Sequence, residues 1–391
     1  MALFLKIAGT AILFAVIAVC LAITIMPRFL DRVYYVGPAT GHFDGERFFN
    51  PTADEDIFRP PSGAGGRFGM IWRYLTGNDG RPPWPKSVPV RQTKPAARVE
   101  GDRMIATWIG HATVLIQTQG LNILTDPIWS DKTGPLWFGP RRVTVPGVRF
   151  EDLPKIDLVL ISHNHYDHLD VPTLKRLWER DRPRIVTSLG NDALIRKAGA
   201  DSTALDWGQH VAIRPGVEVF VTRNHHWGSR WFTDRNRALW SSFVVRLPEG
   251  GNIFFAGDTG LGDGKWPAEA AAYGPIRFAM IPIGAFRFVP GQMESGSHVG
   301  PGNAIRIFDR LGAAKAIPIH WGTYRLSYEA RDTPPKMLSA LMHCTGGEAG
   351  SFAPAEIGAP IEVAPYAPLA KRPDEGLIAQ CLQRPDIRAL D

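Results

Sequence analysis

The spacing of apolar and polar residues divides the chain into three parts. Residues 7 to 26 form an unbroken apolar run of twenty residues without a charge. Between residues 36 and 98, glycine, proline and aromatic residues interrupt every period, so neither a helix nor a strand is predicted there. From residue 103 onward, short runs rich in β-branched residues recur between glycine-containing turns, which predicts a domain built largely of β-strands.

The first part, residues 1–35, is predicted to be a single-pass membrane anchor. As a helix, its apolar run is long enough to cross a hydrocarbon core of about 30 Å. The alternative is a cleaved signal peptide, but the run exceeds the usual apolar stretch of such a peptide and no Ala-x-Ala site accompanies it. Lys6 stands on one side of the run and Arg28 and Arg32 on the other, so charge does not decide which side of the membrane holds the rest.

The second part, residues 36–98, is predicted to be an arm that packs on the domain after it. A free linker would be polar, whereas this segment is rich in aromatic residues. A lipid-facing role for some of them is the alternative, because aromatic side chains suit membrane interfaces. The aromatic residues considered are Phe43, Phe48, Phe49, Phe58, Phe68, Trp72, Tyr74 and Trp84.

The third part, residues 99–370, is predicted to be an α/β domain, followed by a tail at residues 371–391. Helices are predicted at residues 171–180, 190–199 and 300–312. Predicted strands include RMIATWIG, IDLVLIS, RIVTS, GVEVFVTR, NIFFAGD, FAMIPIG and KAIPIH. Because helices follow strands in both halves, we expect two packed sheets with helices outside them. The sequence after residue 326 is uninformative.

Histidine and aspartate follow several of these strands. The segment ISHNHYDHLD (161–170) holds three of the 11 histidines of the chain. Three further strands are followed by His225 and His226, by Asp258, and by His320. Strand ends in a layered α/β domain can converge on one rim, where loops build active sites. Convergence from four strands favours a metal site over a histidine-rich surface loop.

The spacing H-x-H-x-D-H can serve two adjacent metals. The first two histidines can point the same way from an extended turn, while the aspartate and the third histidine face another way. Imidazole and carboxylate ligands without thiolate suit Zn²⁺, and less specifically iron, manganese or cobalt. The predicted sets are His163, His165 and His226 at one metal, Asp167, His168 and His320 at the other, and Asp258 as a bridge.

Several motifs carry a family resemblance. TWIGHATVLI, LISHNHYDHLD, FAGDTG and IPIHWGTY resemble the metallo-β-lactamase fold superfamily of binuclear metallohydrolases. With ILTDPIW, GPRRV, HHW and IPIGA, in order over residues 103–325, they are similar to the N-acylphosphatidylethanolamine-hydrolysing phospholipase D family and its bacterial relatives. The resemblance implies a four-layer αβ/βα sandwich, two Zn²⁺ per chain and the seven ligands above. It also favours His226 over His225, because the family histidine directly precedes tryptophan.

Other residues are candidates for substrate handling. Asp167 is expected to orient the attacking water as well as to bind metal. His298, in HVGP, resembles a family histidine near the substrate, although Gly300 stands where the family has aspartate. Arg141 and Arg142 could hold a substrate phosphate, with a solvated surface pair as the alternative.

Two further features are weighed against packing roles. His111 is expected to support the site from behind a ligand, or to be a loop histidine. A cluster of large apolar residues follows the predicted strand that ends in ILTD. It could form an acyl-chain groove, but packing in the core is favoured. The cluster comprises Trp129, Leu136, Trp137 and Phe138.

Composition narrows the partners. A net charge of +6 favours anionic partners such as phosphate groups or acidic lipid headgroups, but the excess is thinly spread and no specific nucleic acid is expected. Cys20, Cys344 and Cys381 show no paired spacing, so neither a disulfide framework nor a cysteine metal site is predicted. The oligomeric state is left open.

The resulting hypothesis is a membrane-anchored, zinc-dependent phosphodiesterase of the phospholipase D type, acting on (N-acyl)phospholipids with water activated between two metals. Alternatives among hydrolases are a lactone, a sugar phosphate or a nucleic-acid phosphodiester as substrate. From other classes, the alternatives are a mono-iron dioxygenase and a non-catalytic membrane partner. The sequence contains neither G-x-S-x-G nor a P-loop, which excludes serine hydrolase and nucleotide kinase interpretations.

Overall fold

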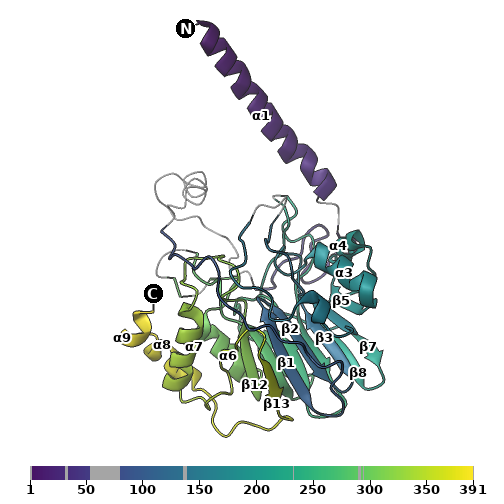
Figure 1. Ribbon diagram of the computed structural model, residues 1–391, viewed down its shortest axis with the longest axis vertical. Coiled ribbons are helices and arrows are strands. Elements are labelled where there is room, and N and C mark those ends of the chain that lie inside the picture. The colour runs from purple at the N-terminus through teal and green to yellow at the C-terminus, as the bar shows by residue number, and fades with distance from the viewer. Residues whose placement is uncertain are drawn as a thin grey trace.

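The computed structural model describes residues 2–30, 34–52, 80–134, 139–231, 233–288, 292–293 and 295–390. Helix α1 (Ala2–Leu30) precedes a sandwich of two sheets, from which it projects (Figure 1). Within the described part of the chain, one helix is long and apolar enough to cross a membrane, over Leu3–Ile25 with a mean hydropathy of 2.6. A signal sequence near the N-terminus can also satisfy these two criteria, so this helix does not by itself separate the two interpretations.

The first sheet has seven strands. In spatial order they are β13 (Pro360–Val363), β1 (Met104–Gly110), β2 (Thr113–Thr118), β3 (Leu121–Thr125), β4 (Leu158–Ile161), β5 (Arg184–Ser188) and β6 (Thr203–Leu205). β13, β1, β2 and β3 pair antiparallel, whereas β3 through β6 pair parallel. The parallel half therefore brings the carboxyl ends of four strands, β3 to β6, to one edge of the sheet.

The second sheet has six strands. In spatial order they are β12 (Lys315–Ile319), β11 (Ile276–Pro282), β10 (Asn252–Phe255), β9 (Ser242–Arg246), β8 (Val217–Thr222) and β7 (His210–Arg214). β10, β11 and β12 are parallel, and the pairs from β7 to β10 are antiparallel.

Side-chain alternation places the core between the two sheets. Along β2, Val114 and Ile116 pack with residues of the second sheet, whereas Leu115 packs on the opposite side with helical residues. All three are fully buried, because this strand is covered on both faces.

Helices cover both outer faces. Helix α3 (Val171–Asp181) packs Leu174 and Leu177 on the first sheet, and α4 (Asp192–Ile195) lies beside it. Helices α5 (Trp266–Ala271), α6 (Pro301–Arg310) and α7 (Thr333–Cys344) cover the second sheet. Figure 1 shows α3 and α4 on one side of the sandwich and α6 and α7 on the other. The predicted four-layer αβ/βα sandwich is confirmed.

Regular elements agree with the sequence pattern where apolar periodicity is strong. β5 occupies the predicted residues 184–188, and α3 begins at the predicted Val171. The helix predicted at 190–199 is shorter, because the segment forms only α4 and the 3₁₀ turn η3 (Arg196–Ala198). A further 3₁₀ turn is η2 (Phe150–Asp152).

The sequence after residue 326 proved to contain structural elements. α7 begins with two prolines in its first turn, where their missing N–H groups cost nothing. β13 lacks a regular alternation of apolar and polar residues because it is an edge strand. Its position depends on antiparallel pairing with β1, more than 250 residues earlier. Such long-range pairing leaves no local signal.

The described part of the arm packs on the domain, as expected. Phe43 and Phe48 are buried against Leu239 and Trp240. By contrast, Phe49 is 39% exposed. The remaining described aromatic residue, Trp84, donates its indole N–H to the carbonyl of Glu329 at 3.1 Å. Four residues of the predicted aromatic set lie outside the described residues: Phe58, Phe68, Trp72 and Tyr74.

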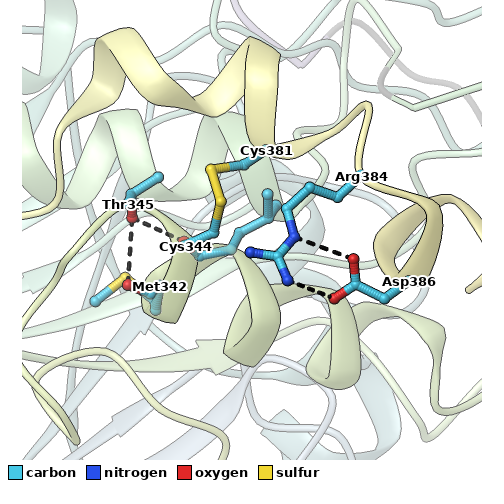
Figure 2. The surroundings of a disulfide bond; sticks show 7 residues. Met342, Cys344, Thr345, Cys381, Arg384 and Asp386 are labelled. Carbon is cyan, nitrogen blue, oxygen red and sulfur yellow. Dashed lines mark hydrogen bonds and ion pairs between the residues drawn. A yellow bond between two sulfur atoms is a disulfide. The ribbon is translucent and has the colours of Figure 1, made fainter.

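A disulfide bond joins Cys344, the last residue of α7, to Cys381 at the end of α8 (Ile378–Cys381) (Figure 2). The cysteine analysis, which predicted no disulfide, was wrong because the two sulfurs are brought together only by tertiary packing. The C-terminal segment then continues through η4 (Glu375–Leu377), which precedes α8, and α9 (Pro385–Arg388), which follows it. Ile378 and Ile387 of this segment are buried in the core beside α6 and α7.

This bond should stabilise the C-terminal segment. Closing a loop with a sequence separation of 37 restricts the unfolded chain, and Cys344→Ala is expected to lower the free energy of unfolding by about 2 to 4 kcal/mol. Thermal unfolding of the variant and of the wild type, with and without reductant, measures the difference. Reductant should lower the melting temperature of the wild type alone, and an equal effect on both proteins would contradict a native bond.

Candidate metal centre

The centre forms where strands of both sheets end. His163 follows β4 by two residues and His226 lies four residues after β8. In the second sheet, Asp258 follows β10 and His320 directly follows β12. These side chains and their neighbours form groups of potential ligand atoms that lie within 4.8 Å of one another. The sheets thus bring together the residues that the strand-end argument selected.

The first group comprises His163, His165, His226 and Asp258. His165 Nδ1 lies 2.8 Å from His163 Nε2 and 3.4 Å from His226 Nε2. Three nitrogens bound to one tetrahedral zinc at about 2.0–2.1 Å would be about 3.3 Å apart. The three rings therefore present nitrogens at spacings suited to one metal ion.

The second group comprises His111, Asp167, His168 and His320. Asp167 Oδ2 lies 3.6 Å from His168 Nε2 and 3.5 Å from His320 Nε2. Asp258 joins the two groups, because its Oδ2 is 3.1 Å from His168 Nε2 and 2.9 Å from His320 Nε2. Its position between the groups agrees with the predicted bridging role, which stays a prediction.

A buried aspartate that the sequence analysis did not select orients both groups. Asp126, after β3, accepts hydrogen bonds from His168 Nδ1 at 2.7 Å and from Ser162 Oγ at 2.5 Å. Ser162 Oγ in turn accepts from His163 Nδ1 at 2.9 Å. These contacts hold both rings by their Nδ1 side, so that Nε2 of each ring faces the centre.

Two other contacts hold ligand candidates in place. His226 Nδ1 donates to the carbonyl of Ser297 at 2.9 Å, which leaves its Nε2 as the inward acceptor. Arg230 Nη1 donates to the carbonyls of Asn164 and Leu169 at 3.0 and 2.9 Å, one near each end of the histidine motif. Sequence reasoning also missed Arg230, which carries no motif signal, whereas Asp126 could have been found because it too follows a strand.

Backbone strain is concentrated here. His111, Asp126 and His320 have positive φ values of 54°, 29° and 62°. Such conformations cost on the order of 1–3 kcal/mol each for residues with a Cβ, and they persist where surrounding contacts over-determine them. The three residues stand where the chain leaves a strand, so the strain directs their side chains into the centre.

Burial and the neighbouring charges set the protonation states of the two groups differently. Burial lowers the pKa of His165 to about 3 and holds the pKa of His163 and His226 well below the usual value, so these rings are neutral. Burial alone would raise the pKa of Asp258, but the neighbouring His168 and His320 keep it well below its ordinary range. The pKa of His320 is lowered by burial and raised more strongly by Asp258 and Asp167, to about 9.

The residues fit a metal centre of two ions. Asp258 Oδ1 is buried without a hydrogen-bond partner, although Asp258 is an ionised carboxylate. Imidazoles with carboxylates, and no thiolate in either group, match the ligands that zinc and other first-row metals accept. A buried carboxylate oxygen without a hydrogen-bond partner among the described residues is costly, and a cation beside it would remove that cost.

The remaining predicted residues lie at different distances from the candidate metal centre. The ring of His226, not that of His225, enters the first group, while the backbone of His225 pairs with Gly260. His298 lies beside the centre, with Nδ1 3.8 Å from Asp258 Oδ2. His111 Nε2 lies 2.9 Å from Asp167 Oδ2 within the second group, and its expected role in supporting a ligand stays a prediction.

The two arginines of GPRRV diverge. Arg141 is 72% exposed and pairs with Asp131 at 3.0 Å, beside a cavity of about 700 Å³ that Tyr166 of the histidine motif also lines. Arg142 is only 8% exposed. Trp129 packs with the core beneath α3, as favoured, and its indole donates to Val148. The other members of its predicted cluster, Leu136, Trp137 and Phe138, lie outside the described residues.

Comparison with known proteins agrees with this geometry. A family profile described as a beta-lactamase superfamily domain matches residues 121–321. An N-acyl-phosphatidylethanolamine-hydrolyzing phospholipase D 1 of Caenorhabditis elegans is 34% identical over 254 residues, which are 61% of this chain and 70% of the relative.

Solved structures share the fold at lower identity. A protein described as a possible metal-dependent hydrolase from Veillonella parvula is 18% identical with a TM-score of 0.53, over 66% of this chain and 99% of that one. CmlA, a diiron beta-hydroxylase from Streptomyces venezuelae, is also 18% identical with a TM-score of 0.50, over 68% and 54% of the two chains. The chain therefore belongs to the β-lactamase superfamily and, within it, to the family that contains the N-acyl-phosphatidylethanolamine-hydrolyzing phospholipase D proteins.

Proposed function

We propose that this protein is a zinc-dependent phosphodiesterase of the phospholipase D type, acting on phospholipids at a membrane surface. The observation that carries the proposal is the pair of adjacent histidine and aspartate groups joined through Asp258. Similarity to a phospholipase D that hydrolyses N-acyl-phosphatidylethanolamine supports the choice of substrate class. The family membership supports hydrolysis as the reaction.

Seven residues would hold two metal ions. His163, His165 and His226 would bind the first, Asp167, His168 and His320 the second, and Asp258 would contact both. When bound, such a metal pair supplies Lewis acidity that activates water and offsets the negative charge that develops on the phosphate. The solved structures with this fold include a diiron enzyme, so the fold alone does not select zinc. A ligand set of imidazoles and carboxylates favours zinc.

The other residues would position the reactants. Asp167 Oδ2 accepts from His111 at 2.9 Å, which orients a carboxylate that would accept a hydrogen bond from the attacking water. His298 has a pKa lowered by burial to about 4, and as a neutral imidazole it can accept or donate a hydrogen bond to the substrate. Ser295 fixes the backbone of His298, because its hydroxyl accepts the N–H at 3.0 Å.

A phosphodiester in a lipid is favoured over the other hydrolase substrates. The net charge of +6 attracts anionic surfaces, and α1 offers a means of residence at the bilayer. A lactone is neutral and gains nothing from this charge. Sugar-phosphate and nucleic-acid phosphodiesters share the phosphate chemistry, but a membrane helix would serve no purpose for them.

We propose further that α1 anchors the chain and that the catalytic domain faces an oxidising compartment. Charge around the apolar run does not decide the orientation, and the bond between Cys344 and Cys381 supports the choice of an oxidising side. Structural disulfides form and persist outside the reducing cytosol.

A matched pair of variants should distinguish the role of the metal ligands from that of His298. Asp258→Ala is expected to lose both bound metal and at least about 100-fold in turnover, because it removes the residue shared by the two groups. His298→Asn should keep about two metal ions per chain and lose mainly kcat. Elemental analysis and initial rates measure the two effects. Full turnover by Asp258→Ala would contradict the bridging role, and metal loss in His298→Asn would make that residue structural.

A substrate panel tests the reaction itself. The full-length protein in detergent, loaded with zinc, should hydrolyse N-acylphosphatidylethanolamine faster than phosphatidylcholine or bis-p-nitrophenyl phosphate, and should leave homoserine lactones intact. Product release is followed by mass spectrometry. Turnover of the lactones alone would overturn the phosphodiesterase proposal, and one iron per chain with oxygen uptake would favour the dioxygenase alternative.

Anchoring and orientation can be measured in membranes of an expressing cell. The full chain should stay in the membrane fraction after a carbonate wash, whereas a chain beginning at residue 34 should not. Cys344 and Cys381 should resist a thiol reagent until reductant is added, because both are bonded. Release of the full chain by carbonate would contradict the anchor, and free thiols in the untreated protein would contradict the oxidising location.

A further inference from the structure

The side chain of Arg142 is buried beside the metal centre. Its guanidinium carbon lies 5.7 Å from the centre of the Tyr324 ring. That ring packs edge-on against His111, with 5.2 Å between the ring centres. Arg142 therefore lies one side chain away from the second group of ligand candidates.

Two backbone segments fix this position. Val143 donates its N–H to the carbonyl of Thr323 at 2.9 Å, and Arg142 donates its own N–H to the carbonyl of Asp131 at 2.9 Å. Arg142 Nη2 lies near Gly110, since a Cβ built on that glycine would be 3.8 Å away. The guanidinium is thus held between the residue that precedes His111 and the loop that follows His320.

Among the residues that the structure describes, none accepts a hydrogen bond from this guanidinium. Nε, Nη1 and Nη2 of Arg142 are all buried without such a partner. By contrast, the buried Arg277 donates to the carbonyls of Asp102, Val363 and Ala364. The nearby carboxylates are engaged elsewhere, because Asp131 pairs with Arg141 and Asp167 accepts from His111.

An unpartnered buried guanidinium is costly, and its persistence next to a reaction centre points to a ligand. A guanidinium is always charged and presents N–H donors in a planar fork that matches two oxygens of a phosphate. Stacking on Tyr324 satisfies only the face of the fork and leaves its donors unused. The missing partner is therefore an oxyanion that enters with the substrate.

We propose that Arg142 forms an oxyanion site for a phosphate group bound at the metal centre. This inference rests on the proposed function and deepens it, because it assigns one residue to recognition of the phosphodiester. It also distinguishes the arginines of the GPRRV motif, since Arg141 is solvated and already paired. The same chemistry would accept a lipid headgroup phosphate or free inorganic phosphate.

The test is equilibrium binding of inorganic phosphate to the zinc-loaded full-length protein, measured by titration calorimetry. Arg142→Met should weaken phosphate binding at least about 10-fold, since hydrogen bonds to charged groups are the stronger ones in proteins. Arg142→Lys keeps the positive charge but loses the planar fork of N–H donors, so this variant should weaken phosphate binding by an intermediate factor. Arg149→Met, which removes an exposed arginine from the same stretch of chain, is the control and should bind as the wild type does.

Stability and metal content distinguish a binding role from a structural one. Arg142→Met removes an unpaired buried charge, so its melting temperature should equal or exceed that of the wild type, with unchanged metal content. Unchanged phosphate affinity in this variant would overturn the proposal. A fall in melting temperature together with loss of metal would also overturn it, because Arg142 would then support the fold.

Further measurements identify the source of the phosphate and test the oxyanion site separately from the proposed phosphodiesterase activity. Sedimentation with phosphatidylcholine vesicles, with and without phosphatidic acid, is compared for wild type and Arg142→Met in a chain beginning at residue 34. Dependence on both Arg142 and phosphatidic acid assigns a lipid headgroup, and loss of inorganic phosphate binding alone assigns a small anion. If no phosphodiester is hydrolysed but phosphate binding still requires Arg142, the proposed function fails while the oxyanion site stands.

Discussion

The buried carboxylate of Asp126 is the interaction on which the geometry of the centre depends. It accepts hydrogen bonds from the backbone and hydroxyl of Ser162 and from the ring of His168, and through Ser162 it also fixes the ring of His163. Burial raises the pKa of this aspartate, and the bonds from His168 and Ser162 oppose that effect. One residue at the end of β3 thus orients a ligand candidate in each of two adjacent groups, and the histidine motif would lose its shape without it.

The sandwich supplies the frame for that interaction but does not dictate its chemistry. Both sheets end at the same rim, and the core between them leaves the strand ends little freedom to move. The same fold carries a diiron hydroxylase and a protein described as a metal-dependent hydrolase. What favours a hydrolase here is therefore the local set of ligand types, together with the similarity to a curated phospholipase D.

The arm connects the N-terminal part of the chain to the same rim. Asn50 donates its amide to the carbonyl of His226 at 2.9 Å and accepts from the indole of Trp240 at 3.2 Å. Tyr34 adds a hydrogen bond to Asp234 at 3.0 Å. The segment that follows α1 thus contacts the backbone of a ligand candidate directly, so the catalytic rim and the start of the domain lie close together.

The sequence by itself determined the elements with strong periodicity and the sandwich. It also determined six of the seven ligand candidates, which stand in or directly after a strand-end motif. The seventh, His226, was chosen over His225 because of the family resemblance. These are local properties, because the period of a strand and the chemistry of H-x-H-x-D-H are contained in short segments. Only the tertiary structure decided the pairing of β13 with β1, the bond between Cys344 and Cys381, and the different surroundings of Arg141 and Arg142. Each depends on contacts between residues far apart or on burial by other segments, which no local pattern encodes.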